Sequence, residues 1–65
     1  MLKMSASSNA FLRQNLPDAL RATHVNDALD ALYDWIDLHG FAQNGLYNAL
    51  GQEAQAVYDD LFDNN

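Results

Sequence analysis

Four aspartates on one expected helix, residues 26–40, are the side chains of this chain with the clearest chemical potential. They recur at spacings of 3, 4 and 3 and are Asp27, Asp30, Asp34 and Asp37. At 100° per residue their carboxylates fall within a sector of roughly 80°, and successive ones lie roughly 4.5 to 6 Å apart along the helix axis. Residues 26–40 contain no Lys or Arg to pair with them. The row predicts either a solvated face or a surface that binds cationic groups.

A second group of acids follows nearer the C-terminus. Its members are Glu53, Asp59, Asp60 and Asp63. The chain has nine acidic residues against three basic ones, a net charge of −6, and all three bases precede residue 22. A body of this charge repels nucleic acid and anionic lipid surfaces and attracts a basic partner.

The aspartates lower the stability of the helices that carry them, which favours a role beyond that of a solvated face. Asp is a weaker helix former than Glu, Lys or Arg. Like charges at i and i+4, such as Asp30 and Asp34, cost a few tenths of a kcal/mol, and the negative end of a helix disfavours carboxylates in its last turns. Because no Lys or Arg compensates, we interpret the eight acids of the C-terminal two-thirds as a partner-binding surface, with solubility as the alternative.

Trp35 is the only tryptophan, and it projects between the acidic and apolar sectors of the same helix. We expect it at the margin of the core, and its place beside the acids makes it a candidate binding hot spot. The three tyrosines are expected at the edge of the core with solvated hydroxyl groups.

Catalysis and metal binding find little support in these residue types. The chain lacks Cys, a Gly-rich phosphate loop and a plausible pairing of nucleophile and base, so no enzyme activity is expected. His24 and Asp27 are three residues apart, but no loop follows the calcium-binding pattern, and we expect neither a metal nor a cofactor.

The elements that position these side chains are helices. We expect one all-α domain over residues 1–65, with residues 1–8 as a loosely ordered start in which Ser7 or Ser8 caps a first helix over residues 9–16. Pro17 predicts a break, and residues 17–23 form a short second piece. Whether residues 5–23 make one helical piece or two stays open.

Two longer helices follow. The first begins after Thr23 or Asn26 as its cap, ends at Gly40, and carries an apolar stripe beside the acidic row. That stripe consists of Val25, Leu29, Leu32, Tyr33 and Ile36. After a turn at Asn44–Gly45 that is not expected to form a hairpin, apolar residues recur at helical spacing until about residue 62. They are Leu46, Leu50, Ala54, Val57 and Leu61.

In this last segment, Gly51 marks either a bend or a later helix start, at Asn48. The predicted fold is a small bundle of three to four helices, of which the two at the C-terminal end are long.

Composition excludes several further classes. Hydrophobic residues make up 49% of the chain, too many for a disordered acidic tail. The sequence contains no run of about 18 apolar residues, so it predicts no membrane span. Residues 1–8 lack the apolar core of a secretory signal. The absence of Cys is typical of a cytoplasmic protein.

The size, the helical pattern and the acid rows DALDALYDWID and VYDDLFDNN resemble small acidic anti-CRISPR proteins of phages and other mobile elements. The resemblance implies a non-enzymatic inhibitor in a bacterial host cell. Such a protein binds a CRISPR effector complex, here of the type I Cascade kind, through an acidic surface that mimics DNA and blocks target DNA binding. The family shares no sequence motif, so the site residues named above rest on helical geometry.

The alternative is an acidic interaction or regulatory module that docks on a partner helix, or forms a weak homodimer, through its apolar aromatic surface. Salt separates the two, since electrostatic mimicry weakens with ionic strength and apolar docking does not.

Overall fold

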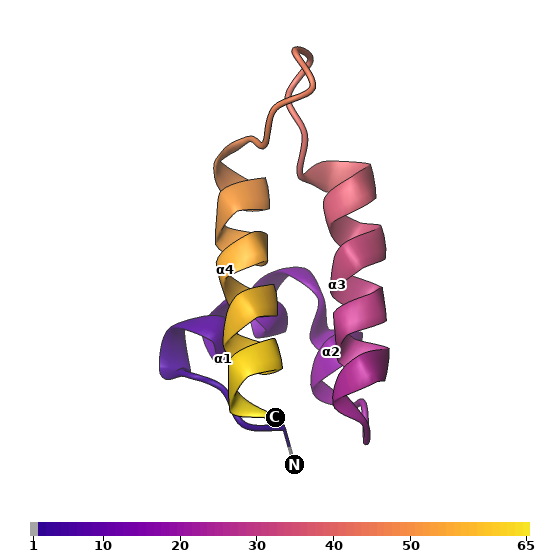
Figure 1. Cartoon of the computed structure of the whole chain (residues 1–65), viewed down its shortest axis with the longest axis vertical. Helices are drawn as coiled ribbons and strands as arrows, with labels where there is room; N and C mark the ends of the chain where they lie inside the picture. The colour runs from indigo at the N-terminus through magenta and orange to yellow at the C-terminus, as the bar shows by residue number, and fades with distance from the viewer. Residues whose placement is uncertain (1) are drawn as a thin grey trace.

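Two long antiparallel helices form the spine of the molecule (Figure 1). The computed structural model describes residues 2–65, which form α1 (Ala6–Asn15), α2 (Pro17–Leu20), α3 (Val25–His39) and α4 (Ala49–Asn64). Helices α3 and α4 lie side by side, and α1 and α2 pack behind them near the end where both termini lie (Figure 1). The prediction of a small all-α bundle with two long C-terminal helices is confirmed.

The N-terminal segment runs along the end of α4. The backbone N–H of Lys3 donates to Asn65 Oδ1 at 3.0 Å, and Asn65 Nδ2 donates to the Lys3 carbonyl at 2.8 Å. Helix α1 begins at Ala6, three residues earlier than predicted, because Ser5 is the capping residue and its Oγ accepts from the Ser8 N–H. The expected caps, Ser7 and Ser8, therefore lie inside the helix. Met1 lies outside the described residues.

Pro17 divides the N-terminal third as predicted. Helix α1 ends at Asn15, Leu16 adopts a non-helical backbone with φ −149° and ψ 64°, and Pro17 opens the single turn of α2. Residues 5–23 thus contain two helical pieces. The expected cap of α3 was wrong: His24, with extended backbone and no side-chain hydrogen bond, precedes the helix, and Asn26 lies within its first turn.

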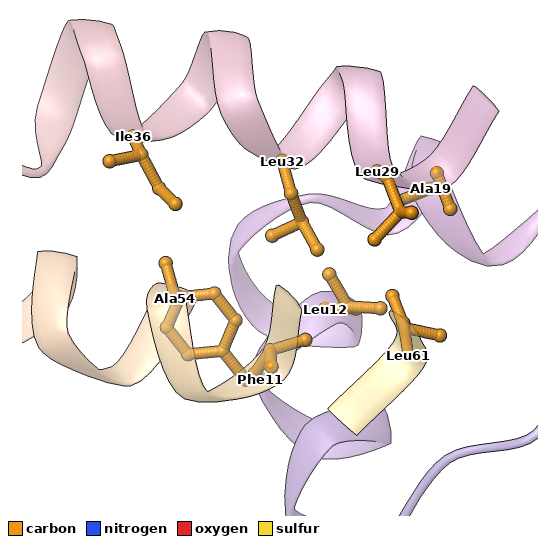
Figure 2. Packing of buried hydrophobic residues seen from close by; sticks show 10 residues of the cluster. Phe11, Leu12, Ala19, Leu29, Leu32, Ile36, Ala54 and Leu61 are labelled. Atoms are coloured by element: carbon orange, nitrogen blue, oxygen red, sulfur yellow. The ribbon is translucent and has the colours of Figure 1, made fainter. Parts of the chain in front are cut away.

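The core is formed by side chains from all four helices (Figure 2). Leu29, Leu32 and Ile36 of α3 are buried as predicted. Tyr33 is not part of the buried face, since 68% of it is exposed. The other buried hydrophobic residues are Phe11, Leu12, Ala19, Ala28, Ala54, Val57 and Leu61.

Helix α4 starts later than the apolar pattern suggested. Asn48 caps it by accepting a 2.7 Å hydrogen bond from the Gly51 N–H to its Oδ1. Leu46, which the pattern placed on the buried stripe, therefore lies before the helix and is exposed. The alternative of a start at Asn48 was the better of the two predictions, and Gly51 lies in the first turn.

Gly51 has a packing role there. It faces Gly40 at the end of α3, and both glycines are buried. A Cβ on Gly51 would lie 2.9 Å from the Gly40 carbonyl carbon and 3.0 Å from its Cα. The two helices approach this closely at their loop ends because neither residue carries a side chain.

The loop between α3 and α4 extends beyond the helices (Figure 1). Phe41 and Tyr47 form a single antiparallel bridge, and the Ala42 N–H donates to the Leu46 carbonyl at 2.8 Å. The expected turn at Asn44–Gly45 is present, with Gly45 at a φ of 83°, a conformation that favours glycine. Within residues 2–65 no strand pair forms around it, as the sequence indicated.

Candidate functional site

The four aspartates of α3 form an exposed row. Asp27, Asp30, Asp34 and Asp37 are all solvent-exposed, whereas Ala28, Leu29, Leu32 and Ile36 on the same helix are buried. By helical geometry the row lies opposite the buried face. The expected place beside the apolar stripe was inaccurate, because it counted Tyr33 as part of the core. The rigid back of α3 thus presents four carboxylates to solvent.

Among residues 2–65, no Lys or Arg side chain pairs with this row. Arg21 pairs with Asp18 at 3.1 Å, the one ion pair among residues 2–65. Arg13 donates from Nη2 to Asn9 Oδ1 at 2.6 Å. Both arginines lie in the N-terminal third, so the charge of the α3 row is available to a partner.

The acids of α4 do not share one face with this row. Asp59 and Asp63 are exposed, and Asp59 Oδ1 accepts from Gln55 Nε2 at 3.1 Å. Glu53 lies elsewhere, beside a shallow cleft between α1 and α4 that Phe11 and Gln14 also line. These three acids of α4 and the four of α3 are therefore divided among three parts of the surface.

Asp60 has a structural role of its own. Its Oδ2 accepts from the Ser5 N–H at 2.9 Å and from Ser8 Oγ at 2.7 Å, and so joins the start of α1 to α4. These hydrogen bonds, the one from the Ser5 backbone first, lower the pKa of the Asp60 carboxyl, while partial burial opposes the shift. Of the predicted site residues, Asp60 is the one whose carboxylate ties two helices together.

Trp35 packs at the margin of the core. Its ring packs edge-to-face against the ring of Phe11, with centroids 5.6 Å apart. The His39 ring packs against it at a tilt, with centroids 5.2 Å apart. Trp35 is half-buried. This position agrees with the core-margin interpretation and leaves part of the indole at the surface.

The structure also forms a groove that the sequence did not reveal. It lies between α3 and α4 near the connecting loop and has a volume of about 280 Å³. Its lining comes from both helices and the loop: Tyr33, Ile36, Asp37, Phe41, Tyr47, Gln55 and Tyr58. Four of these seven are aromatic and one is a carboxylate. The sequence placed the tyrosines at the edge of the core, but not together.

Hydrogen bonding and stacking order one wall of this groove. The rings of Phe41 and Tyr47 lie 5.0 Å apart, and the Tyr47 hydroxyl donates to Gln55 Oε1 at 3.2 Å. Gln55 in turn donates to Asp59. An acid of α4 is thereby connected to the wall of a groove that Asp37 of α3 also lines.

Residues 2–65 contain neither a metal-binding cluster nor a helix able to cross a membrane. No three His, Asp or Glu side chains in this range come together to hold a metal ion. None of its helices combines the length and apolar character that crossing a membrane requires. Comparisons with protein-family models, curated proteins and solved structures gave no match to this chain.

Proposed function

We propose that this protein works by binding a basic, nucleic-acid-binding protein through the acidic face of α3, without catalysis. The observation that carries the proposal is the exposed row Asp27, Asp30, Asp34 and Asp37, which makes no ion pair with any of residues 2–65. A site that grips phosphates with Lys and Arg also attracts carboxylates held at similar spacing. Because the helix is rigid, few degrees of freedom are lost on binding.

We further propose that the partner is a CRISPR effector complex, of the Cascade-forming type I kind, and that the protein blocks its binding to target DNA. The support is the resemblance in size, helical fold and acid rows to small acidic anti-CRISPR proteins. In this function the α3 row occupies part of the DNA path. The mechanism requires only competition for the same basic side chains, since neither protein nor partner is altered chemically.

A specific observation favours a second candidate, docking through apolar surface. Leu38, near the end of α3, is 77% exposed, Leu46 in the loop is 67% exposed, and Leu50 in the first turn of α4 is 43% exposed. Large exposed apolar side chains of this kind mark a candidate contact surface. A second copy of the chain, or a partner helix, would cover them.

The test measures target duplex binding by a Cascade-type complex with and without this protein, at two salt concentrations. The proposal expects inhibition that high salt relieves and that the triple variant Asp27→Asn, Asp30→Asn, Asp34→Asn loses. Inhibition that persists in the variant and at high salt would move the contact to the apolar end. Absence of binding to any such complex would remove this partner.

A further inference from the structure

We infer that the groove between α3 and α4 binds the guanidinium group of an arginine side chain, supplied by the basic partner. The inference rests on the proposed function for the partner's charge, and it adds a specific pocket to a diffuse electrostatic surface. The site consists of the aromatic rings of Tyr33, Phe41, Tyr47 and Tyr58 with the carboxylate of Asp37.

The lining has the chemistry that recognises a cation. Aromatic faces attract positive charge through their quadrupole, and Tyr33 and Asp37, at i and i+4 on α3, are neighbours on the helix surface. Tyr33 is 68% exposed, and Phe41 and Tyr47 are each more than 40% exposed, so their rings are accessible. A groove that combines a carboxylate with accessible aromatic rings binds a cation more favourably than it binds an aliphatic side chain.

The charge around the groove is negative on both sides. Asp37 lines it from α3, and Asp59 is hydrogen-bonded to the lining residue Gln55 on α4. The C-terminal end of α3 adds the negative end of its dipole at the same place. The imidazole ring of His39, the basic side chain nearest in sequence, packs against Trp35. No Lys or Arg occurs after residue 21 to occupy the groove.

Arginine fits this lining better than lysine does. A guanidinium is planar, stacks on aromatic rings and donates two parallel hydrogen bonds to one carboxylate, whereas an ammonium is a strongly hydrated point charge. The volume of about 280 Å³ accommodates a single side chain and little more. Ile36, which is buried at the base of the groove, provides apolar surface for the methylene groups.

The test titrates the isotope-labelled protein with N-acetyl-arginine methylamide and follows backbone amide signals by NMR. N-acetyl-citrulline methylamide, which has the same shape without the charge, and the lysine analogue are the matched probes. We expect shifts confined to residues around the groove. Binding of the citrulline and lysine probes should be weaker by about five-fold or more.

Variants separate the groove from an acidic residue elsewhere on the surface. Asp37→Asn and Tyr33→Ala should each weaken binding of the arginine probe by about five-fold, while Asp18→Asn, an exposed carboxylate of α2 outside the groove lining, should leave it nearly unchanged. Tyr33 is mostly exposed, so its truncation leaves the core intact. The dispersion of the amide spectrum verifies folding of each variant.

Several results would overturn the inference: equal binding of the citrulline probe, tighter binding of the lysine probe, shifts spread along residues 27–34, or no localised shift. A parallel measurement with the effector complex keeps the two proposals apart. If the complex binds and only the Asp27, Asp30 and Asp34 variant weakens it, the groove assignment fails and the proposed function stands. If no complex binds while the arginine probe does, the proposed partner fails alone.

Discussion

Asp60 shows how identical side chains acquire different roles in one acidic sequence. It follows Asp59 directly, yet Asp59 is exposed whereas Asp60 is half-buried and accepts hydrogen bonds from Ser5 and Ser8. Net charge and helical periodicity alone give no reason to assign different roles to Asp59 and Asp60. Only the arrival of the N-terminal segment, more than 50 residues away in sequence, distinguishes them.

The lowered pKa of Asp60 makes its contribution to stability depend on pH. A carboxyl whose pKa is lower in the folded state stabilises the fold fully above its unfolded pKa, about 3.9, and loses this contribution as the pH falls through the folded value. Asp60→Asn should therefore lower the melting temperature at pH 7 and flatten its decline between about pH 5 and pH 2. Thermal unfolding across this range measures both effects.

Asp63→Asn is the control, since this carboxylate lies nearby in α4 and is exposed. Its melting curve should keep the steeper acid decline of the unsubstituted protein. Parallel declines for the Asp60 variant and the unsubstituted protein would contradict the assigned role.

At the scale of the helices, Gly40 and Gly51 set how closely α3 and α4 approach at the loop end. Gly51→Ala should raise the intrinsic helix propensity of α4, yet the added Cβ meets Gly40 backbone, which cannot move as a flexible side chain would. We expect a net loss of about 1 to 3 kcal/mol in the free energy of unfolding, as for other overpacked sites. Urea unfolding gives this value, and an unchanged or increased stability would show that the contact is not tight.

The exposed neighbour Gln52 provides the matched control. Gln52→Ala lies in the same turn and changes helix propensity in the same direction. Because its side chain faces solvent, it should change stability by no more than about 0.5 kcal/mol.

The acidic row opposes the stability of the helix that carries it. Replacing Asp30 and Asp34 by Asn removes a like-charge pair and a carboxylate near the negative end of α3. Stability at low ionic strength should rise by a few tenths of a kcal/mol, while partner binding weakens. Urea unfolding at two salt concentrations tests the first part. A loss of stability would mean that these carboxylates serve the fold.

The elements could be predicted where one local signal determined them. The periodicity of residues 25–39, the break at Pro17 and the turn at Asn44–Gly45 are local features, and the structure contains all three. The cap at Ser5, the contact of Gly40 with Gly51 and the groove depend on segments distant in sequence. Tyr33, Phe41, Tyr47 and Tyr58 belong to three such segments. The spacing of residues within one helix therefore could not predict that these four aromatic side chains line one groove.

For the whole molecule, the distribution of charge matters more than its total. All three basic residues lie in the N-terminal third, and two of them bond to neighbours in sequence, Arg13 to Asn9 and Arg21 to Asp18. The back of α3 is left with four exposed carboxylates, whereas the exposed Leu46 precedes α4 and the exposed Leu50 lies in its first turn. Electrostatic binding through α3 and apolar docking through Leu46 and Leu50 therefore use different segments and can be separated by substitution.

Replacement of the exposed leucines tests the docking alternative. Leu46→Ser with Leu50→Ser should leave partner affinity within about two-fold if the acidic face of α3 carries binding, since surface substitutions away from a contact have small effects. Sedimentation velocity on the same variant measures self-association. A large loss of partner affinity, or conversion of a dimer to a monomer, would favour the apolar surface.

The most direct test of the acidic face is the affinity for a purified Cascade-type complex, measured between about 50 and 200 mM salt for the protein and for its Asp27→Asn, Asp30→Asn, Asp34→Asn variant. If the row replaces phosphates, the affinity of the unsubstituted protein should fall about ten-fold or more over this range. The variant should bind weakly and depend little on salt. Equal affinities for the two proteins, with the same small salt dependence, would contradict a function carried by the acidic face of α3.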